Sequence, residues 1–309
     1  MIHKNFMSLI GNTQMIEIGR MNPNPDVKIY AKLEGMNPSG SLKDRIALFM
    51  VTEAEKAGLL KPGDTILEAT SGNTGISLAM ISRYKGYKLK AVMPDNVSLE
   101  RRQLLEVYGA ELVLSDGEQG TNGAIKLAQE IGSNGGYFMP DQYSNEANPL
   151  AHYQTTAVEI LKEIPQVDVF IAGLGTAGTL MGVGRRLREA NPGTRIIAVQ
   201  PYPHSGLQGL RNLSDGFVPA ILDLDLLDGN EFVQDEEAFA ALKRLAEEEA
   251  ILAGISSGAV IAKALEVAGT MDNGTVVTIF PDGAWKYLSE KIWTDSPEAV
   301  SKRFTGPLW

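Results

Sequence analysis

Cysteine is absent from the 309-residue sequence, and only three histidines occur, His3, His152 and His204. The absence of cysteine excludes disulfides, cysteine-ligated metals and thiol catalysis. The histidines are scattered along the chain, so they do not predict a zinc site, and we expect no metal. A chain without cysteine is compatible with a reducing compartment, and we expect the protein to be cytoplasmic.

Excess positive charge and long apolar runs are also lacking. The sequence has 28 Lys and Arg against 38 Asp and Glu, a formal net charge of −10. With no cationic surplus to neutralise phosphates, we expect neither nucleic acid nor an anionic membrane as a partner. No run of roughly 18 apolar residues predicts a membrane span, and residues 1–7 lack the apolar core of a signal peptide. The 44% of hydrophobic residues is enough for a packed core, which excludes a disordered or fibrous chain.

Short apolar segments alternate with helical ones along the chain. Strands are predicted at residues 65–68, 90–93, 111–114, 167–172, 195–199 and 275–280, most of them compact and apolar, as in strands covered on both faces. Helices are predicted at 43–56 and 236–249, the second with Asp235 as its N-cap. The alternation predicts an α/β protein with mostly parallel, doubly wound sheets. Such sheets bind ligands at the loops that leave the carboxyl ends of their strands.

The first informative loop, residues 37–45, reads Asn-Pro-Ser-Gly-Ser-Leu-Lys-Asp-Arg and precedes the predicted helix 43–56. Ser41 can cap that helix, and Lys43 then lies in its first turn, where the helix dipole disfavours a cation. One interpretation is a solvated surface lysine. The other is an amine with a lowered pKa, which suits Schiff-base chemistry.

The second loop, residues 68–75, reads Glu-Ala-Thr-Ser-Gly-Asn-Thr-Gly between a strand and a helix expected to open at Ile76. Backbone N–H groups, hydroxyls and an amide at a helix N-terminus are typical of a carboxylate or phosphate site. Ordinary capping and turn chemistry uses the same residue types. The segment alone does not choose between the two.

The third loop, residues 173–179, contains the G-x-G-x-x-G pattern of dinucleotide-binding proteins. That fingerprint requires an acidic residue at the end of the next strand, where this chain has Ala-Val-Gln at 198–200. No Gly-Lys-Ser/Thr follows, so the loop is not a P-loop either. Its two threonines add hydroxyl donors, so we interpret it as a cup for a single phosphate.

The fourth loop, residues 254–258, matches the G-x-S-x-G nucleophile elbow, but no histidine follows Ser256 and the hydrolase reading is disfavoured. What remains is a lysine, an anion-binding loop, a phosphate cup and a serine turn. Pyridoxal 5'-phosphate is a cofactor that carries one phosphate and uses lysine covalently. The residues therefore indicate a pyridoxal-phosphate enzyme.

These four motifs occur in the order in which they are found in the cysteine synthases. The sequence resembles that family, especially cysteine synthase B (O-acetylserine sulfhydrylase B), among the tryptophan-synthase-β-like, fold type II pyridoxal-phosphate enzymes. The likeness extends from residues 10–13 to residues 286–289. It implies a homodimer of two-domain chains: a smaller, mobile domain at 36–145 that binds the substrate carboxylate, and a larger one, 1–35 with 146–309, that binds the cofactor phosphate.

The resemblance also implies roles for individual residues. Lys43 would be the catalytic lysine that binds the cofactor covalently, Asn73 would contact its ring hydroxyl, and Ser256 would face its pyridine nitrogen. The phosphate would lie against Gly175, Thr176, Ala177, Gly178 and Thr179. Substrate would be bound by Thr70, Ser71, Gly72, Asn73, Thr74 and Gln142, with Gly216 in a loop nearby.

The implied activity is that of a pyridoxal-phosphate-dependent transferase of cysteine biosynthesis. O-acetyl-L-serine would lose acetate to leave an α-aminoacrylate, and sulfide or thiosulfate would then add to give L-cysteine. Lys43, once displaced, is a free amine that can take the α-proton. The partners would be the small amino-acid substrate and the sulfur donor, with a sulfur-carrier protein as a further option.

Two alternatives stay open within this fold. The segment around Arg211 resembles the branch that prefers O-phosphoserine, in which an arginine meets the substrate phosphate. Arg211 could instead be an ordinary surface ion-pair residue. A serine or threonine dehydratase shares the same lysine and phosphate cup, and only its product separates it from a cysteine synthase.

Overall fold

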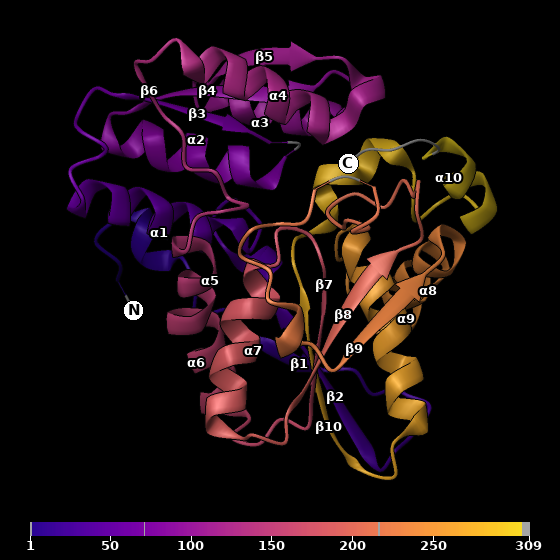
Figure 1. Cartoon of the computed structure of the whole chain (residues 1–309). Coiled ribbons are helices and arrows are strands. Elements are labelled where there is room, and N and C mark those ends of the chain that lie inside the picture. Colours follow the sequence, from indigo (N-terminus) through magenta and orange to yellow (C-terminus); the bar gives the residue numbers. More distant parts are fainter. Residues whose placement is uncertain (1, 71, 216, 305–309) are drawn as a thin grey trace.

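The computed structural model describes residues 2–70, 72–215 and 217–304. Ser71 and Gly216, both predicted to bind substrate, lie outside the described residues. The described chain contains two β-sheets (Figure 1): a six-stranded sheet with the order β1-β2-β10-β7-β8-β9 and a four-stranded sheet with the order β5-β4-β3-β6.

The strands of the six-stranded sheet are β1 (Met15–Glu17), β2 (Val27–Leu33), β7 (Val169–Gly173), β8 (Arg195–Pro201), β9 (Gly229–Val233) and β10 (Gly274–Phe280). Those of the four-stranded sheet are β3 (Thr65–Ala69), β4 (Lys88–Pro94), β5 (Glu111–Ser115) and β6 (Tyr137–Phe138). β1 pairs antiparallel with β2, and all other described pairings are parallel. The predicted α/β class with mostly parallel sheets is confirmed.

Each of the predicted strands is present, with bounds that differ by two residues or fewer. The sequence pattern missed β1, β2, β6 and β9. β6 has two residues and β1 has three, too short for a periodic signal. β9 is an edge strand whose exposed face carries Asn230 and Phe232, so its apolar pattern is broken. β2 has two lysines, Lys28 and Lys32, among its apolar residues, unlike the continuous apolar strands at the sheet centre.

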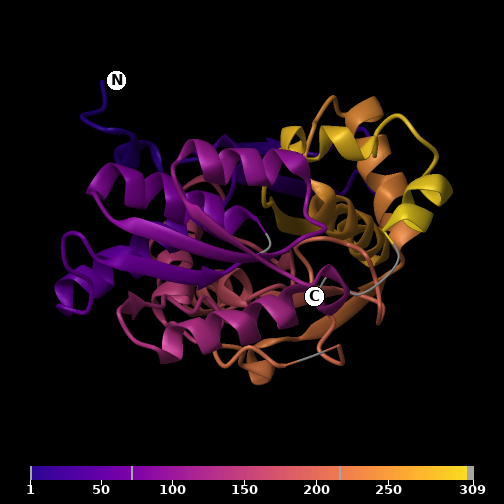
Figure 2. The same ribbon diagram turned by 90° about the horizontal axis from the view of Figure 1, so that it is seen from above.

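Helices cover both sheets. They are α1 (Lys43–Lys56), α2 (Asn73–Lys85), α3 (Leu99–Val107), α4 (Gly120–Ser133), α5 (Ala147–Ala151), α6 (Ala157–Glu163), α7 (Gly178–Ala190), α8 (Asp235–Glu248), α9 (Ile255–Thr270) and α10 (Pro297–Arg303). A π-helical turn, His152–Thr156, joins α5 to α6. Short 3-10 helices lie at Phe6–Leu9, Glu34–Met36, Gly117–Gln119, Leu224–Leu226 and Ala284–Glu290. Seen from above, the N-terminal segment and α10 lie at opposite ends of the molecule (Figure 2).

The predicted helix 236–249 corresponds to α8, whose apolar stripe of Phe239, Leu242 and Leu245 is buried against the core, as its spacing indicates. The expected N-cap was wrong by one residue. Gln234 occupies the cap, and the Glu237 carboxylate accepts a hydrogen bond from its backbone N–H at 3.3 Å. The Asp235 carboxylate is engaged elsewhere, since it accepts hydrogen bonds from Ser205 Oγ and from Gly206 N.

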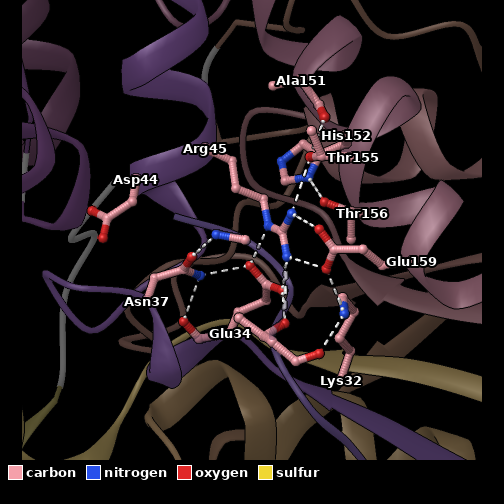
Figure 3. Close-up of polar contacts among 12 residues, drawn as sticks. Lys32, Glu34, Asn37, Asp44, Arg45, Ala151, His152, Thr155, Thr156 and Glu159 are labelled. Atoms are coloured by element: carbon pink, nitrogen blue, oxygen red, sulfur yellow. Dashed lines mark hydrogen bonds and ion pairs between the residues drawn. The ribbon is translucent and has the colours of Figure 1, made fainter. Parts of the chain in front are cut away.

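Three buried charges, on Lys32, Glu34 and Arg45, and the partly buried Glu159 tie α1 to the six-stranded sheet (Figure 3). The Arg45 guanidinium donates to both oxygens of Glu34 at 2.7 and 2.8 Å and to both oxygens of Glu159 at 2.6 and 2.7 Å. Lys32 Nζ lies 2.8 Å from Glu159 Oε2. Although burial acts to raise it, the pKa of Glu34 is lowered to about 2 by the adjacent Arg45. The network therefore stays ionised at neutral pH and anchors the helix that begins at Lys43.

We expect Glu34→Gln to lower the free energy of unfolding by about 3–5 kcal/mol, because the buried Arg45 guanidinium loses the negative charge of its buried partner Glu34. Urea unfolding followed by circular dichroism measures the change. The matched control is Glu17→Gln, which breaks an exposed ion pair with Lys28 and should cost less than about 1 kcal/mol. Equal losses in the two variants would show that the buried network has no special role in stability.

Candidate active site

A cavity of about 970 Å³, including its open mouth, lies at the carboxyl ends of strands from both sheets. Four helices, α1, α2, α7 and α9, point their N-termini at it. The described residues predicted from the sequence that line it are Lys43, Thr70, Gly72, Asn73, Thr74, Gln142, Gly175, Thr176, Ala177, Thr179, Arg211 and Ser256. Gly178 opens α7 directly behind the wall. Because helix N-termini carry positive partial charge and unpaired N–H groups, the cavity is suited to anionic ligands.

Lys43 is the first residue of α1, and its backbone N–H donates to Ser41 Oγ at 3.2 Å. Its half-buried side chain reaches the cavity wall. Burial lowers the pKa of the Lys43 amine to about 8, while the charge of Asp282 acts in the opposite direction. A lysine with this pKa has a usable neutral fraction near neutral pH, which is the form that attacks a carbonyl carbon.

The loop before α7 forms a tight cup. A Cβ on Gly175 would lie 2.8 Å from the Gly209 carbonyl oxygen, and a Cβ on Gly178 would overlap the Asn148 amide. Ala177 has a φ of 71°, a left-handed conformation that turns its neighbours' N–H groups toward one point. Even one added carbon would collide at either glycine, so the bare backbone lines this part of the cup and can approach a ligand.

The hydroxyls of the cup are fixed from behind. Asn148 Nδ2 donates to Thr176 Oγ1 at 3.0 Å and to the Gln142 carbonyl at 2.7 Å, joining the cup to the second half of the site. Thr179 Oγ1 lies 3.3 Å from His152 Nε2. Burial and the charge of Arg45 lower the pKa of His152 to about 3, so the ring is neutral beneath the cup.

The loop between β3 and α2 forms the opposite wall. Thr70 Oγ1 accepts from Gly72 N at 3.2 Å and Gly75 N at 3.1 Å, which is ordinary turn chemistry. Thr74 Oγ1 donates to Gln142 Oε1 at 2.6 Å. α2 begins at Asn73, three residues before the expected Ile76, so Asn73 and Thr74 belong to its first turn. The turn-chemistry reading is confirmed for Thr70, and the loop also lines the cavity, where the binding of a carboxylate or phosphate stays a prediction.

Glu68, at the end of β3, supports this wall from below. Its carboxyl oxygens lie 3.1 Å from Asp141 N and 3.4 Å from Gln142 N. Burial raises the pKa of Glu68 to about 8. The segment that presents Gln142 to Thr74 is thus held by a buried carboxyl group.

The segment after β10 contributes residues that were not among the predicted site. Asp282 and Tyr287 line the cavity. Asp282 Oδ2 accepts from Asn73 Nδ2 at 2.9 Å and from the Tyr287 hydroxyl at 2.6 Å, and Lys286 Nζ donates to Asn73 Oδ1 at 2.6 Å. A signal was available, because residues 281–287 directly follow a predicted strand, where ligand-binding loops are expected.

Arg211 is buried, with only 1% of its surface exposed. Its guanidinium lies 4.2 Å from the centre of the Phe217 ring and 5.4 Å from that of Tyr143, and Nη1 donates to the Phe217 carbonyl at 3.2 Å. Among the described residues, Nε and Nη2 make no hydrogen bond, and no ion pair includes Arg211. The surface ion-pair interpretation is therefore wrong. A buried cation lacking a counter-charge lines the cavity.

Ser256 lies in the first turn of α9, following the cap residue Gly254, and its buried side chain reaches the cavity floor. Within the described residues, no cluster of His, Asp or Glu could hold a metal ion. Across the same described part of the chain, every helix is too short or too polar to cross a membrane.

A family profile described as "Pyridoxal-phosphate dependent enzyme" matches residues 6–282. The chain belongs to this family. A curated "Cysteine synthase" of Staphylococcus aureus is 44% identical over 300 residues, covering 94% of this chain and 97% of that protein. The family assignment names the cofactor, pyridoxal phosphate, and Lys43 and the loop before α7 line one cavity.

Solved structures give the same relationship. The crystal structure of an O-ureido-L-serine synthase is 40% identical with a TM-score of 0.89, and the match covers 96% of this chain and 98% of that one. A hydrogen sulfide-producing enzyme of Fusobacterium nucleatum is 42% identical with a TM-score of 0.85, covering 93% and 100% of the two chains.

We expect Gly175→Ala to weaken binding of pyridoxal phosphate to the apoprotein by roughly tenfold or more, because the added Cβ forces the cup away from the Gly209 carbonyl and misplaces N–H donors to a charged group. A fluorescence titration measures the dissociation constant. Gly19→Ala is the control, since nothing lies within 4 Å of its Cβ. Unchanged affinity in Gly175→Ala would show that the phosphate binds elsewhere.

Proposed function

We propose that the protein makes L-cysteine by replacing the β-substituent of an activated serine, O-acetyl-L-serine, with a sulfur nucleophile, sulfide or thiosulfate. The observation that carries the proposal is that Lys43, with its pKa near 8, shares one cavity with the cup at the N-terminus of α7. The similarity to a curated cysteine synthase supports the choice of substrate.

The residues present fit pyridoxal phosphate. The cup of residues 175–179 would hold the phosphate, Lys43 would bind the aldehyde carbon, Asn73 would lie at the ring hydroxyl, and Ser256 at the pyridine nitrogen. Bound in this way, the cofactor supplies an electron sink for the electron pair released at the substrate Cα. The Ser256 hydroxyl cannot donate a proton to the ring nitrogen as a carboxylic acid would. The weaker sink favours loss of the β-substituent over transamination.

The chain's own side chains account for the remaining steps. N–H groups at the start of α2, together with Thr70, Thr74 and Gln142, would bind the substrate carboxylate, and Ser71 and Gly72 belong to the same loop. The Lys43 amine, neutral once substrate has displaced it, would take the proton from Cα. Burial of the amine, which lowers its pKa, keeps a neutral fraction available for this step.

We also propose the domain division 36–145 against 1–35 with 146–309. Its support is that the four-stranded sheet falls within the first range and the six-stranded sheet within the second. Closing of the smaller domain over the carboxylate would shield the reaction from water. We propose a cytoplasmic homodimer that takes small-molecule substrates, with a sulfur-carrier protein as an alternative sulfur donor.

Lys43→Ala should abolish both the visible absorbance of the cofactor-loaded protein and the formation of cysteine from O-acetyl-L-serine and sulfide. In the wild-type apoprotein, the rate of cofactor capture should rise with pH and level off above about 8, because only the neutral amine reacts and its pKa is lowered to that value. Stopped-flow absorbance measures both effects.

Lys32→Ala is the control for loss of a lysine that is buried away from the cavity. A Lys43→Ala protein that keeps its absorbance would overturn the proposal. Formation of a keto acid and ammonia without any sulfur donor would indicate a dehydratase instead.

Arg211 favours a second candidate substrate, O-phospho-L-serine. Within the part of the chain that the structure describes, two of its guanidinium nitrogens have no hydrogen-bond partner and no carboxylate pairs with it. An unpaired buried charge is strongly unfavourable, and a phosphate dianion supplies the counter-charge with paired hydrogen bonds. The resemblance of the surrounding segment to the phosphoserine-dependent branch supports the same assignment.

If phosphoserine is the substrate, Arg211→Ala should lower kcat/KM for phosphoserine by roughly a hundredfold, corresponding to about 2–3 kcal/mol from a charge-assisted hydrogen bond. Activity with acetylserine, measured on the same preparation, is the internal control and should change much less. Equal losses with both substrates would point to a packing role for Arg211 against Phe217 and Tyr143 instead.

A further inference from the structure

Lys286 is a buried cation that the proposed reaction does not use. It lies in the 3-10 helix Ala284–Glu290, has no exposed surface, and takes part in none of the ion pairs found among the described residues. Its ammonium donates to Asn73 Oδ1 at 2.6 Å and to the Gly40 carbonyl at 3.2 Å. Burying an ammonium whose direct partners are neutral oxygens is unfavourable, so this contact is expected to serve a purpose beyond packing.

The partners of Asn73 determine which way its amide faces. An ammonium only donates hydrogen bonds, so the atom it touches must be the amide oxygen. An ionised carboxylate only accepts them, so the atom that touches Asp282 Oδ2 at 2.9 Å must be the amide nitrogen. Lys286 and Asp282 thus fix the two ends of the amide. One hydrogen of Nδ2 is engaged by Asp282, and the other is left for a ligand in the cavity.

We propose that Lys286 is a positioning residue that holds Asn73 so that its amide presents only N–H to the cofactor's ring hydroxyl oxygen. This inference rests on the proposed function, in which Asn73 lies at that oxygen. A charged donor on the amide oxygen also polarises the amide and strengthens its N–H as a donor. The ring oxygen is then stabilised in its ionised form, which is the form that gives the bound cofactor its visible absorbance.

The charges around Lys286 are consistent with a cation at this position. Burial lowers the pKa of Lys286 to about 8. The negative charges of Asp282 and Asp44 act to raise this pKa, and the positive charge of Arg101 acts to lower it further. The ammonium therefore predominates at neutral pH. Lys286 also joins distant parts of the chain, because its partner Gly40 lies before α1 and its partner Asn73 opens α2. Its own backbone carbonyl accepts a hydrogen bond from Ser98 Oγ.

The test is the absorption spectrum of the cofactor-loaded protein at neutral pH, read as the ratio of the visible to the near-ultraviolet band. Lys286→Met should lower this ratio by roughly twofold to tenfold, the change expected for loss of one hydrogen bond. Asn73→Ala should lower it similarly. The double variant should match Asn73→Ala alone, because Lys286 acts through Asn73.

The matched control is Lys32→Met. Lys32 is equally buried, with 1% of its surface exposed, and its ammonium donates to the Thr13 carbonyl and pairs with Glu159, away from the cavity. It should lower stability but leave the band ratio at the wild-type value. A similar spectral change in Lys32→Met would show that the ratio reports general loosening, and the proposal would fail.

Other outcomes also decide the matter. An unchanged ratio in Lys286→Met, or additive effects in the double variant, would overturn the positioning role while leaving the proposed function intact. Absence of any visible band in the wild type would instead overturn the proposed function. If methionine prevents folding, Lys286→Arg keeps a cationic donor. A folded Lys286→Arg protein should retain a ratio near wild type, and a ratio as low as that of Asn73→Ala would contradict the proposal.

Discussion

The parallel pairing of the strands is the constraint on which the rest of this structure depends. In a parallel sheet every strand ends at the same edge, and the helix that follows begins there. Two such sheets face one cavity here, so the N-termini of α1, α2, α7 and α9 converge on it. The site thereby gains backbone donors and positive partial charge without a metal ligand set or a cysteine.

Buried charge is used in two different ways. Around Arg45, two carboxylates and two cations compensate one another, and the result is a rigid support for the helix that carries Lys43 (Figure 3). Arg211 and Lys286 are buried without an ion pair among the described residues. An uncompensated charge raises the energy of the ligand-free protein, so it is most easily understood where a ligand or a polarised amide completes the arrangement. This contrast separates supporting charges from those assigned to function.

The site also shows a layered organisation. In the loop proposed to hold the phosphate, Asn148 donates to the Thr176 hydroxyl and His152 lies against that of Thr179. Asn73 is likewise held by Lys286 and Asp282. Pre-oriented donors need no rearrangement when charge develops, which is the basis of electrostatic catalysis. The residues that touch ligand and the residues that orient them come from segments far apart in the sequence.

The sequence by itself determined the α/β class, the strands at the centre of each sheet and the loops that line the cavity. These follow from local rules: apolar periodicity within a strand, and small or hydroxyl residues where a strand turns into a helix. The edge strand β9 was not predicted, because exposed residues interrupt its short apolar pattern. The capping of α8 by Gln234 was not predicted either, because Asp235 forms hydrogen bonds with another segment.

Only the tertiary structure decided how the charges are paired. Nothing local distinguishes Arg45, which is compensated by Glu34 and Glu159, from Arg211, which is buried and forms no ion pair with any described residue. The contact of Lys286 with Asn73 spans most of the chain. The burial of a side chain and the groups that it contacts depend on its position in the folded chain. They determine the pKa of Glu34 and the orientation of the Asn73 amide, which no sequence motif encodes.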